Sequence, residues 1–485
     1  MFQNLNSLNY LQEINCDYCI VGSGPAGITL ANSLDKKYKI VLCEAGDFLQ
    51  TDSSTDCYKG EVIGDPYFEL DVCRLRQFGG TSGHWGGWSR TLDDVDFVKK
   101  NLNKLAYWPI EKKDLDIYLD EALPIINVET IPQDEIMSKE FGIKKVYFKY
   151  SETENKHPTR FGEKYKKKIL DSKNIHLYIN SNLTKVLSED QVVTEAHFKS
   201  FNKKNLKVKA KVFIFAMGGI ENSRQLAWQQ IQNNKKLYPS NLPVGRYWIE
   251  HPHYSIGEIL LSNKVNLSFF TLTKAKQLEK GVMSCALRVH GQKLSKTKDL
   301  ARDLLCKVPN LSEKFIYNLK KNLLCSAHIE TQWEQSPEFS NKISLSNNQR
   351  DFFNIPRPVL NWTKVDLDYI TVKETLNQFN QWILSEDLGR IKMEEWLLDE
   401  NYKNINLKEK GPFIEANGGN HHMGGTRMAN DPNYGVVDKN CKVHGSKNLY
   451  MAGSSVFPTG GYSNPTLTIV QLSLRLANYF NNMKI

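Results

Sequence analysis

The chain has 485 residues, of which 40% are apolar and 24% are charged, and its formal net charge is +9. This composition is ordinary for a soluble globular protein. The excess positive charge comes mostly from scattered lysines and short lysine-led runs, which favours solvated basic surfaces over a patch that binds nucleic acid or a membrane.

The N-terminus and the cysteines bear on the location of the protein. Residues Met1–Asn15 are polar and show no secretory signal pattern, and no apolar run reaches the ~18 residues of a spanning helix. Nine cysteines are spread widely, and an odd number without an export signal indicates reduced thiols. We therefore expect a cytoplasmic protein without a membrane span. No Cys/His cluster has metal-ligand spacing, so we expect no metal, and the oligomeric state is left open.

The segment Cys16–Gly46 predicts a strand–helix–strand unit. Tyr18–Val21 is short, apolar and rich in strand-forming residues, which is typical of a buried parallel strand. Ile28–Leu34 continues with helical spacing, and the apolar run Lys39–Cys43 predicts a second strand.

Glycines and an acidic residue sit at the turns of this unit. Gly22, Gly24 and Gly27 form G-x-G-x-x-G directly after the first strand, and Glu44 ends the second. The glycines permit a tight turn, close approach of a pyrophosphate and helix–strand packing, and the helix N-terminus attracts phosphates. Glu44 is placed to bond ribose hydroxyls. The motif predicts dinucleotide binding, and Glu44 followed by Ala-Gly favours FAD over NAD.

A later segment returns to the nucleotide fold. Lys211–Ala216 is an apolar strand that leads through Met217-Gly218-Gly219 into the helical run Glu221–Trp228. This order fits flavoproteins whose cofactor domain is interrupted by inserts.

The rest of the chain predicts further elements with little site chemistry. Leu115–Tyr165 shows helical and loop patterns, and the lysine-rich stretch Leu267–Leu323 is partly helical. Strands are predicted at Leu177–Asn180, Ala196–Phe201, Leu206–Ala210, Cys325–Trp333 and Lys342–Leu345, and helices at Asp114–Ala122 and Ile370–Trp382.

The C-terminal part carries a histidine and an asparagine on two glycine-containing turns. His422 lies in HHMGGTRM, and Asn464 lies in Gly-Tyr-Ser-Asn-Pro. An imidazole with an ordinary pKa near ~6.5 can accept the proton of an alcohol as its hydride leaves. An amide does not titrate, so it can hold the hydroxyl without competing as a base. The pair suits oxidation of an alcohol to a carbonyl.

With these segments in order, the chain resembles the glucose–methanol–choline (GMC) oxidoreductase family over essentially its whole length. Pyranose oxidase-like and bacterial sugar or polyol dehydrogenase-like members are nearest. The segments that carry the resemblance are the N-terminal fingerprint, Gly79–Gly87, Trp108-Pro109-Ile110 with the helix after it, Ala216–Gly219, Val244–Pro252, Ile355–Pro358 and the C-terminal block.

The resemblance implies an α/β fold: a Rossmann-type FAD-binding domain of the glucose oxidase-like kind, with an interleaved α+β substrate domain on a mixed or antiparallel sheet. It assigns residues 1–105, 160–253 and 415–485 to the FAD-binding domain. Residues 106–159 and 254–414 form the substrate-binding domain.

The resemblance also implies roles for individual residues. His422 and Asn464 match the family's catalytic pair, and hydride passes to flavin N5. His421 and His251 are expected to be structural. His84 is a candidate for covalent attachment of FAD, the alternative being an imidazole that packs near the flavin. The expected FAD-binding residues are Gly22, Gly24, Pro25, Ala26, Gly27, Glu44, Gly79, Gly80, Thr81, His84, Trp85, Val186, Ala216, Gly218, Gly453, Asn464, Pro465 and Thr466.

By resemblance, the substrate is a sugar, a cyclitol or an amino-sugar, and Glu330, Gln332 and His328 are candidates for binding its hydroxyls. The electron acceptor stays open between oxygen, a quinone and a redox protein. Gly86 stands where pyranose oxidase has a threonine near the flavin, and the missing hydroxyl favours a dehydrogenase over an oxidase.

Two other functions stay open. A few relatives keep FAD but cleave hydroxynitriles by acid–base chemistry, so a lyase with a non-redox flavin is an alternative. An NAD-dependent dehydrogenase is a second one, which the absorbance of the purified protein would distinguish.

Overall fold

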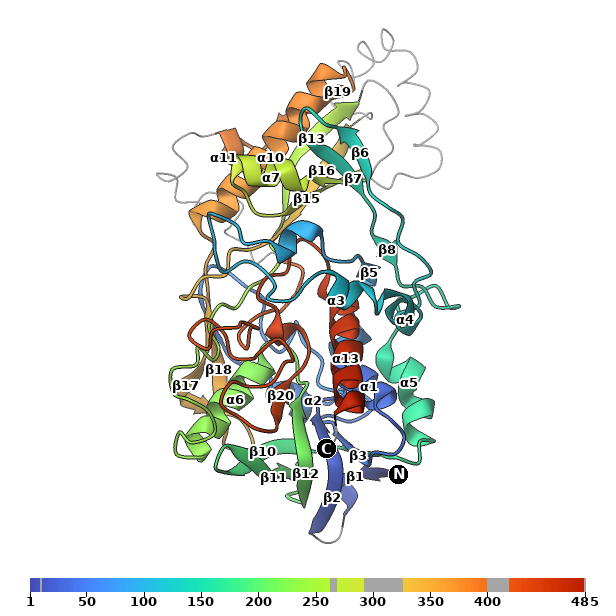
Figure 1. Cartoon of the computed structure of the whole chain (residues 1–485), viewed down its shortest axis with the longest axis vertical. Coiled ribbons are helices and arrows are strands. Elements are labelled where there is room, and N and C mark those ends of the chain that lie inside the picture. Colours follow the sequence, from blue (N-terminus) through green and yellow to red (C-terminus); the bar gives the residue numbers. More distant parts are fainter. Residues whose placement is uncertain (9–10, 262–267, 292–325, 399–417, 484–485) are drawn as a thin grey trace.

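The computed structural model describes residues 1–8, 11–261, 268–291, 326–398 and 418–483. Two sheets lie toward opposite ends of its long axis (Figure 1). The larger sheet is at the lower end, where both termini also lie, and the smaller one is at the upper end. No helix within the described ranges combines the length and apolarity that crossing a membrane requires.

Across the described residues, the larger sheet has eight strands in the order β1-β9-β3-β2-β12-β11-β10, with β20 beside β12. The β1, β9, β3, β2, β12 and β20 pairings are parallel, and β10, β11 and β12 pair antiparallel. The bounds are β1 (Phe2–Asn4), β2 (Gln12–Val21), β3 (Ile40–Cys43), β9 (Ile175–Ile179), β10 (Asn182–Glu189), β11 (Val192–Lys199), β12 (Asn205–Phe215) and β20 (Leu449–Met451).

The predicted strands at Leu206–Ala210 and Lys211–Ala216 are in fact one strand, β12. It pairs with β2 along its length, from Leu206 to Phe215. Its other edge is shared, because β11 pairs with its first half and β20 with its last three residues. The eleven residues of β12 therefore provide room for both β11 and β20 on the edge opposite β2.

Helices cover the parallel part of this sheet. α1 (Pro25–Ser33) packs against α13 (Pro465–Asn482), and α5 (Phe161–Leu170) lies beside α1. In α13, apolar positions recur at the spacing of one helix face and are buried, which explains why this segment forms a packed helix. These positions are Leu467, Val470, Leu474 and Ala477.

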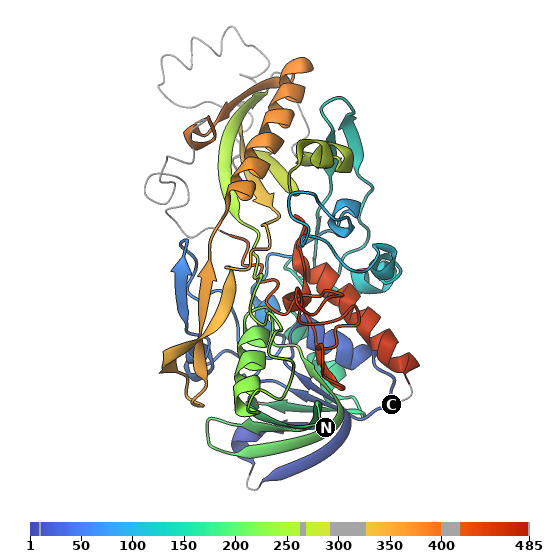
Figure 2. The same cartoon turned by 60° about the vertical axis from the view of Figure 1, so that its left-hand side comes forward.

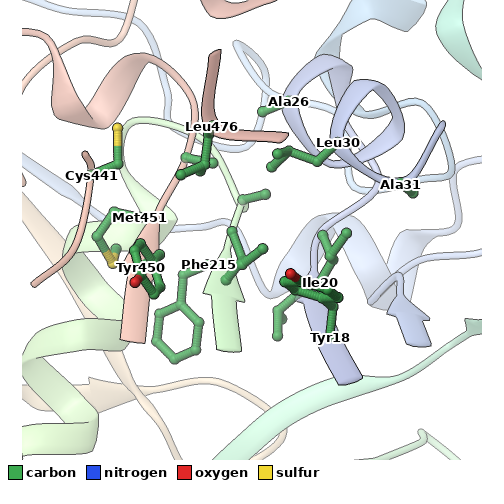
Figure 3. Close-up of a cluster of buried hydrophobic side chains, with 14 of the residues drawn as sticks. Tyr18, Ile20, Ala26, Leu30, Ala31, Phe215, Cys441, Tyr450, Met451 and Leu476 are labelled. Atoms are coloured by element: carbon green, nitrogen blue, oxygen red, sulfur yellow. The ribbon is translucent and has the colours of Figure 1, made fainter. Parts of the chain in front are cut away.

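Figure 3 shows the core between these layers. Tyr18 and Ile20 of β2 lie beside Phe215 of β12 and Tyr450 of β20, with Leu30 of α1 above them. Burying apolar side chains of this size is the main source of stability for such an arrangement, at roughly 1.5–3 kcal/mol each. The core therefore holds α1 and the C-terminal strand on the same sheet.

The smaller sheet is antiparallel throughout its described pairings, in the order β19-β13-β16-β15-β14-β7-β6. α10 (Asp366–Ser385) packs across it and buries Phe379 and Trp382 against the strands (Figures 1 and 2). The bounds are β6 (Glu135–Ser138), β7 (Ile143–Val146), β13 (His253–Leu261), β14 (Phe269–Leu272), β15 (Cys285–Gly291), β16 (Ser326–Trp333) and β19 (Gly389–Met393).

Sequence analysis missed β6, β7 and β8 in the stretch Leu115–Tyr165, where only helices and loops were expected. β6 and β7 form the edge of the smaller sheet, where tertiary pairing decides the conformation of short segments. Of the stretch Leu267–Leu323, the described part holds β14, α7 and β15, and residues 292–323 lie outside the described ranges.

Smaller elements complete the fold. β17, β18 and β4 form a third sheet, which joins a segment near the N-terminus to the segment after β16. Where the two predicted domains divide stays a prediction. The remaining bounds are α2 (Asp52–Asp56), β4 (Glu61–Gly64), β5 (Trp88–Ser89), α3 (Lys113–Asp116), α4 (Leu119–Ile125), β8 (Lys149–Tyr150), α6 (Glu221–Gln232), α7 (Lys274–Lys280), β17 (Lys342–Arg350), β18 (Pro356–Trp362) and α11 (Glu395–Leu398).

Candidate functional site

A cavity of about 360 Å³ lies at the carboxyl ends of four parallel strands of the larger sheet. The residues that follow these strands line it: Gly22 after β2, Glu44 after β3, Ala216 after β12 and Gly453 just after β20. In open α/β sheets, ligands bind outside the carboxyl ends of the strands. The cavity is therefore the site that the fold itself provides.

The turn after β2 and the first turn of α1 each have a position where a side chain would clash. Gly22 has a φ of +105°, and a Cβ there would lie 2.5 Å from the carbonyl oxygen of Ala216. A Cβ on Gly27 would lie 1.9 Å from the carbonyl oxygen of Gly22. The missing side chains let the turn, α1 and the end of β12 meet in one place.

Glu44 is held by the same turn. Its Oε2 accepts hydrogen bonds from the amide (3.0 Å) and the hydroxyl (2.6 Å) of Ser23, and its Oε1 accepts from the amide of Gly46 (2.8 Å). The carboxylate is buried and lines the cavity. Oε1 accepts only one of these hydrogen bonds, so it keeps a further acceptor position for a ligand hydroxyl.

Positive charge gathers around this cavity. The N-terminal ends of α1, α6 and α13 all contribute lining residues, and each helix N-terminus carries a partial positive charge. The buried side chains of Arg74 and Arg76 also line it, and Nη1 of Arg74 has no hydrogen-bond partner among the described residues. Sequence analysis did not select these arginines, because nothing in the local pattern says which way they face.

His422 is anchored through its main chain from two sides. The hydroxyl of Ser454 donates to its carbonyl oxygen (2.6 Å), and Met423, the next residue, exchanges backbone hydrogen bonds with Ile249. A Cβ on Gly219 would lie 2.2 Å from that same carbonyl oxygen. The backbone of the turn before α6, which contains Gly219, therefore packs directly against the backbone at His422.

The imidazole of His422 is buried and lines the cavity. It stacks on Trp248, with ring centroids 6.0 Å apart, and meets the edge of Tyr67 at 6.1 Å. Its Nε2 has no hydrogen-bond partner among the described residues. Burial lowers the pKa of His422 to about 3, and the nearby charges of Arg74 and His84 act in the same direction. The ring is therefore neutral at physiological pH and can accept a proton.

A buried carboxylate organises the neighbouring backbone. Glu250 Oε1 accepts hydrogen bonds from the amides of His251 (2.8 Å) and His421 (2.7 Å), and its Oε2 accepts from the hydroxyl of Tyr67. Burial raises the pKa of Glu250 to about 7, although these hydrogen bonds oppose the shift. Because Tyr67 also contacts the ring of His422, the hydrogen bond from Tyr67 to Glu250 helps to fix the position of that ring.

His421 lines the cavity as well, and its Nδ1 lies 2.9 Å from Nδ1 of His251. The ring of His253 lies 5.9 Å from that of His421. Within the described ranges, no group of three or more His, Cys, Asp or Glu residues is arranged to hold a metal ion. Burial lowers the pKa of His251 to about 3 and that of His253 to about 4, so these rings are neutral.

Asn464 is the N-cap residue of α13, but its side chain makes no capping hydrogen bond. Its Oδ1 instead accepts a hydrogen bond from Nε2 of Gln332 on β16 (2.9 Å). This leaves the amide NH₂ of Asn464 available to a ligand in the cavity that the residue lines. Sequence analysis placed Gln332 near substrate but did not foresee this contact.

The structure gathers most of the predicted residues around the cavity. Val186, Gly27 and Gly79 are not among the lining residues, and Ser181 and Leu183 line it near Val186. Glu330 and Gln332 line an adjoining cavity, and His328 lines neither. The predicted residues that line the main cavity are Gly22, Gly24, Pro25, Ala26, Glu44, Gly80, Thr81, His84, Trp85, Ala216, Gly218, His422, Gly453, Asn464, Pro465 and Thr466.

Comparison with known proteins shows what this chain is similar to. Residues 337–473 match the family model described as GMC oxidoreductase. The whole chain also superimposes on solved structures: formate oxidase of Aspergillus oryzae RIB40 (TM-score 0.58, 15% identity, 96% of this chain and 98% of that chain) and pyridoxine 4-oxidase from Mesorbium loti (TM-score 0.57, 13% identity, 97% and 100%). At this identity the structural matches establish the fold.

Two curated relatives match over shorter regions. The fructose dehydrogenase large subunit of Gluconobacter japonicus is 22% identical over 295 residues, which are 60% of this chain and 51% of that protein. C-glycoside 3-oxidase of Microbacterium trichothecenolyticum is 28% identical over 142 residues, which are 29% of this chain and 24% of that protein. The matches thus span about half or less of the relatives' own length.

The matched segment and the fold are thus similar to those of GMC oxidoreductases, the family that the sequence motifs indicated. The predicted fold class, an α/β FAD-binding fold of the GMC kind, is confirmed. FAD is the cofactor of this class.

Replacing Gly22 tests the assignment of the cavity to FAD. We expect Gly22→Ala to lose most of its bound flavin, because the added Cβ would lie 2.5 Å from the Ala216 carbonyl oxygen. The ratio of flavin to protein absorbance after purification measures the loss. Ser33→Ala, at the far end of α1, is the control and should retain FAD. Full FAD content in Gly22→Ala would contradict the placement.

Proposed function

We propose that this protein oxidises a hydroxyl group of a sugar, a cyclitol or an amino-sugar to a carbonyl, with FAD as the hydride acceptor. The observation that carries the proposal is the buried Nε2 of His422, which is neutral and has no hydrogen-bond partner in the described part of the chain. The names of the fructose dehydrogenase and C-glycoside 3-oxidase relatives support a carbohydrate substrate.

The cavity fits FAD in charge and in shape. A dinucleotide carries two phosphates, and three helix N-termini with Arg74 and Arg76 surround the cavity. Gly24 faces open space on its side-chain side, so a phosphate can approach its backbone. Glu44 Oε1 keeps an acceptor position for a ribose hydroxyl. We therefore assign the diphosphate to the α1 turn and the flavin ring to the region of His84, His422 and Asn464.

The two proposed catalytic residues act on different atoms of the substrate hydroxyl. His422 Nε2 accepts the hydroxyl proton, while the Asn464 amide holds the same oxygen in place. Bound FAD supplies the two-electron acceptor that takes the hydride from the carbon. The packing of Trp248 and Tyr67 around His422 excludes water from the base and keeps its orientation.

The acceptor of the electrons is a separate question. Gly86 lines the cavity without a hydroxyl near the flavin region, and on this ground we propose a dehydrogenase. Oxygen consumption during turnover, compared with reduction of a quinone or a redox dye, decides between oxidase and dehydrogenase.

Replacing the proposed base gives the most direct test. We expect His422→Ala to slow flavin reduction about 10²- to 10⁴-fold, the usual contribution of general acid–base catalysis, with its bound FAD spectrum unchanged. Asn464→Ala should cost about tenfold, the value of one hydrogen bond to the reacting oxygen. Anaerobic stopped-flow bleaching of the flavin measures both rates.

His197→Ala serves as the control, because His197 lies on β11 and outside both cavities. Normal flavin reduction by His422→Ala would remove the histidine from the mechanism. A flavin that stays oxidised with every alcohol tested, in an otherwise intact protein, would instead favour the hydroxynitrile lyase alternative.

The pH dependence follows from burial. Because the pKa of His422 is lowered to about 3, the base form persists as pH falls through 6.5, and flavin reduction should show no loss there. Glu250, whose pKa is raised to about 7 and which contacts Tyr67 beside the His422 ring, is the group next to the proposed base that is expected to titrate near neutrality. Any inflection near pH 7 in the reduction rate should therefore disappear in Glu250→Gln. A tenfold fall per pH unit below 6.5 in both proteins would contradict this.

Covalent attachment of FAD through His84 stays a prediction. His84 lines the cavity, and burial followed by the charge of Arg160 lowers its pKa, which favours the neutral, nucleophilic ring. If the bond forms, flavin colour should stay with the acid-precipitated protein and move to the supernatant in His84→Ala. Release of FAD from the unmodified protein would leave His84 as a packing residue.

A further inference from the structure

A second cavity, of about 270 Å³, adjoins the first at Asn464, which lines both. Strands β13, β15 and β16 of the smaller sheet form one wall of it. Because the proposed reacting hydroxyl is held at Asn464, the rest of the substrate extends from that residue into the second cavity.

One side of this cavity is aromatic. The rings of Phe148 and Phe269 are 4.5 Å apart between centroids, and Trp88 meets Phe269 at 6.0 Å. The strands opposite bring polar groups in register, with His253 paired to Gln332 and Arg288 to Glu330. A ring with an apolar CH face and hydroxyls at its edge matches both walls, as in a sugar or a cyclitol.

Most polar groups in this wall already have partners. Gln332 Nε2 donates to Asn464 Oδ1 and to the carbonyl of Tyr462, and the Gln332 side chain also interacts with the ring of His253. Arg288 Nη1 lies 3.4 Å from Glu330 Oε2. These contacts orient the wall, and the side chains of Arg288 and Glu330 are each 44% exposed, so water can satisfy their remaining positions.

The Nε2 atom of His253 differs from these groups. It is buried and has no hydrogen-bond partner among the described residues. A buried polar atom without a partner is costly, so its place in a ligand cavity points to a partner supplied by the ligand. Burial lowers the pKa of His253 to about 4, so the neutral ring can bond a hydroxyl without adding charge.

The position of His253 relative to Asn464 suggests which hydroxyl it meets. His253 and Gln332 face each other across adjacent antiparallel strands, where directly opposed side chains are about 4.5–5.5 Å apart at Cβ. Gln332 in turn contacts Asn464. The side chain of Gln332 therefore lies between His253 and Asn464, the residue proposed to hold the reacting oxygen.

We propose that His253 Nε2 binds a second hydroxyl of the substrate, on a ring carbon next to the one oxidised, and thereby selects cyclic vicinal diols. The inference rests on the proposed function, since it needs an alcohol that reduces the flavin. His253 takes no proton from the reacting hydroxyl in this assignment; it determines which alcohols are accepted and which of their hydroxyls reacts.

The test is a cycle of two changes, one in the protein and one in the substrate. A hexose that reduces the flavin is compared with its monodeoxy analogues, in the FAD-bound protein and in His253→Leu. In the unmodified protein, one analogue should lose about tenfold in kcat/KM for flavin reduction. His253→Leu should lose about tenfold with the parent hexose and almost nothing further with that analogue.

His253→Gln should recover part of the loss, because its amide can still bond a hydroxyl, whereas a purely structural role would give no such recovery. FAD content and the flavin spectrum check that each variant is folded, and His197→Leu is the control variant. Equal losses in His253→Leu with all analogues would overturn the inference while leaving the proposed function intact. If no sugar or cyclitol reduces the flavin of the unmodified protein, the proposed function and this inference both fail.

Discussion

A ladder of backbone hydrogen bonds at the ends of four parallel strands determines where this protein can bind a ligand. The amide of Gly22 donates to the Cys43 carbonyl, that of Ala216 to Val21, and that of Ala452 to Phe215. Strands β3, β2, β12 and β20 therefore end at one level, although they come from distant parts of the chain. The turns that leave them converge on one cavity, and the two glycines of the first turn make the close approach sterically possible.

The electrostatic character of the cavity follows from this convergence. Helices α1, α6 and α13 begin at or soon after these strand ends, so their N-termini point toward the same space. The same geometry buries His422 among Trp248 and Tyr67, and burial keeps the imidazole neutral. An environment that favours anionic phosphates thus also disfavours a charged histidine, which suits a base that must start unprotonated.

The contact between Gln332 and Asn464 connects the two halves of the site. Asn464 begins α13, which packs on the larger sheet, whereas Gln332 belongs to the smaller sheet. The hydrogen bond between them sets the border between the cofactor cavity and the second cavity. His253, which we propose to shape substrate choice, is then supported by a sheet that takes no part in the strand ladder around the first cavity.

Local signals in the sequence were strong enough to predict the nucleotide-binding unit of the fold and its cofactor. The glycine spacing at Gly22–Gly27, the apolar runs around it and Glu44 predicted the nucleotide-binding unit, because turn geometry and strand burial depend on near neighbours. The motifs around His422 and Asn464 likewise pointed to the family and its cofactor.

Only the tertiary structure decided which residues share a surface. Arg74 and Arg76 face the cavity because of chain packing, not local pattern, and the edge strands β6 and β7 form because the smaller sheet offers them a partner. The unpartnered Nε2 of His253 and the low pKa of His422 are also products of burial among distant segments. A sequence specifies the residue types that chemistry needs, whereas hydrogen-bond partners and desolvation exist only once segments hundreds of residues apart have come together.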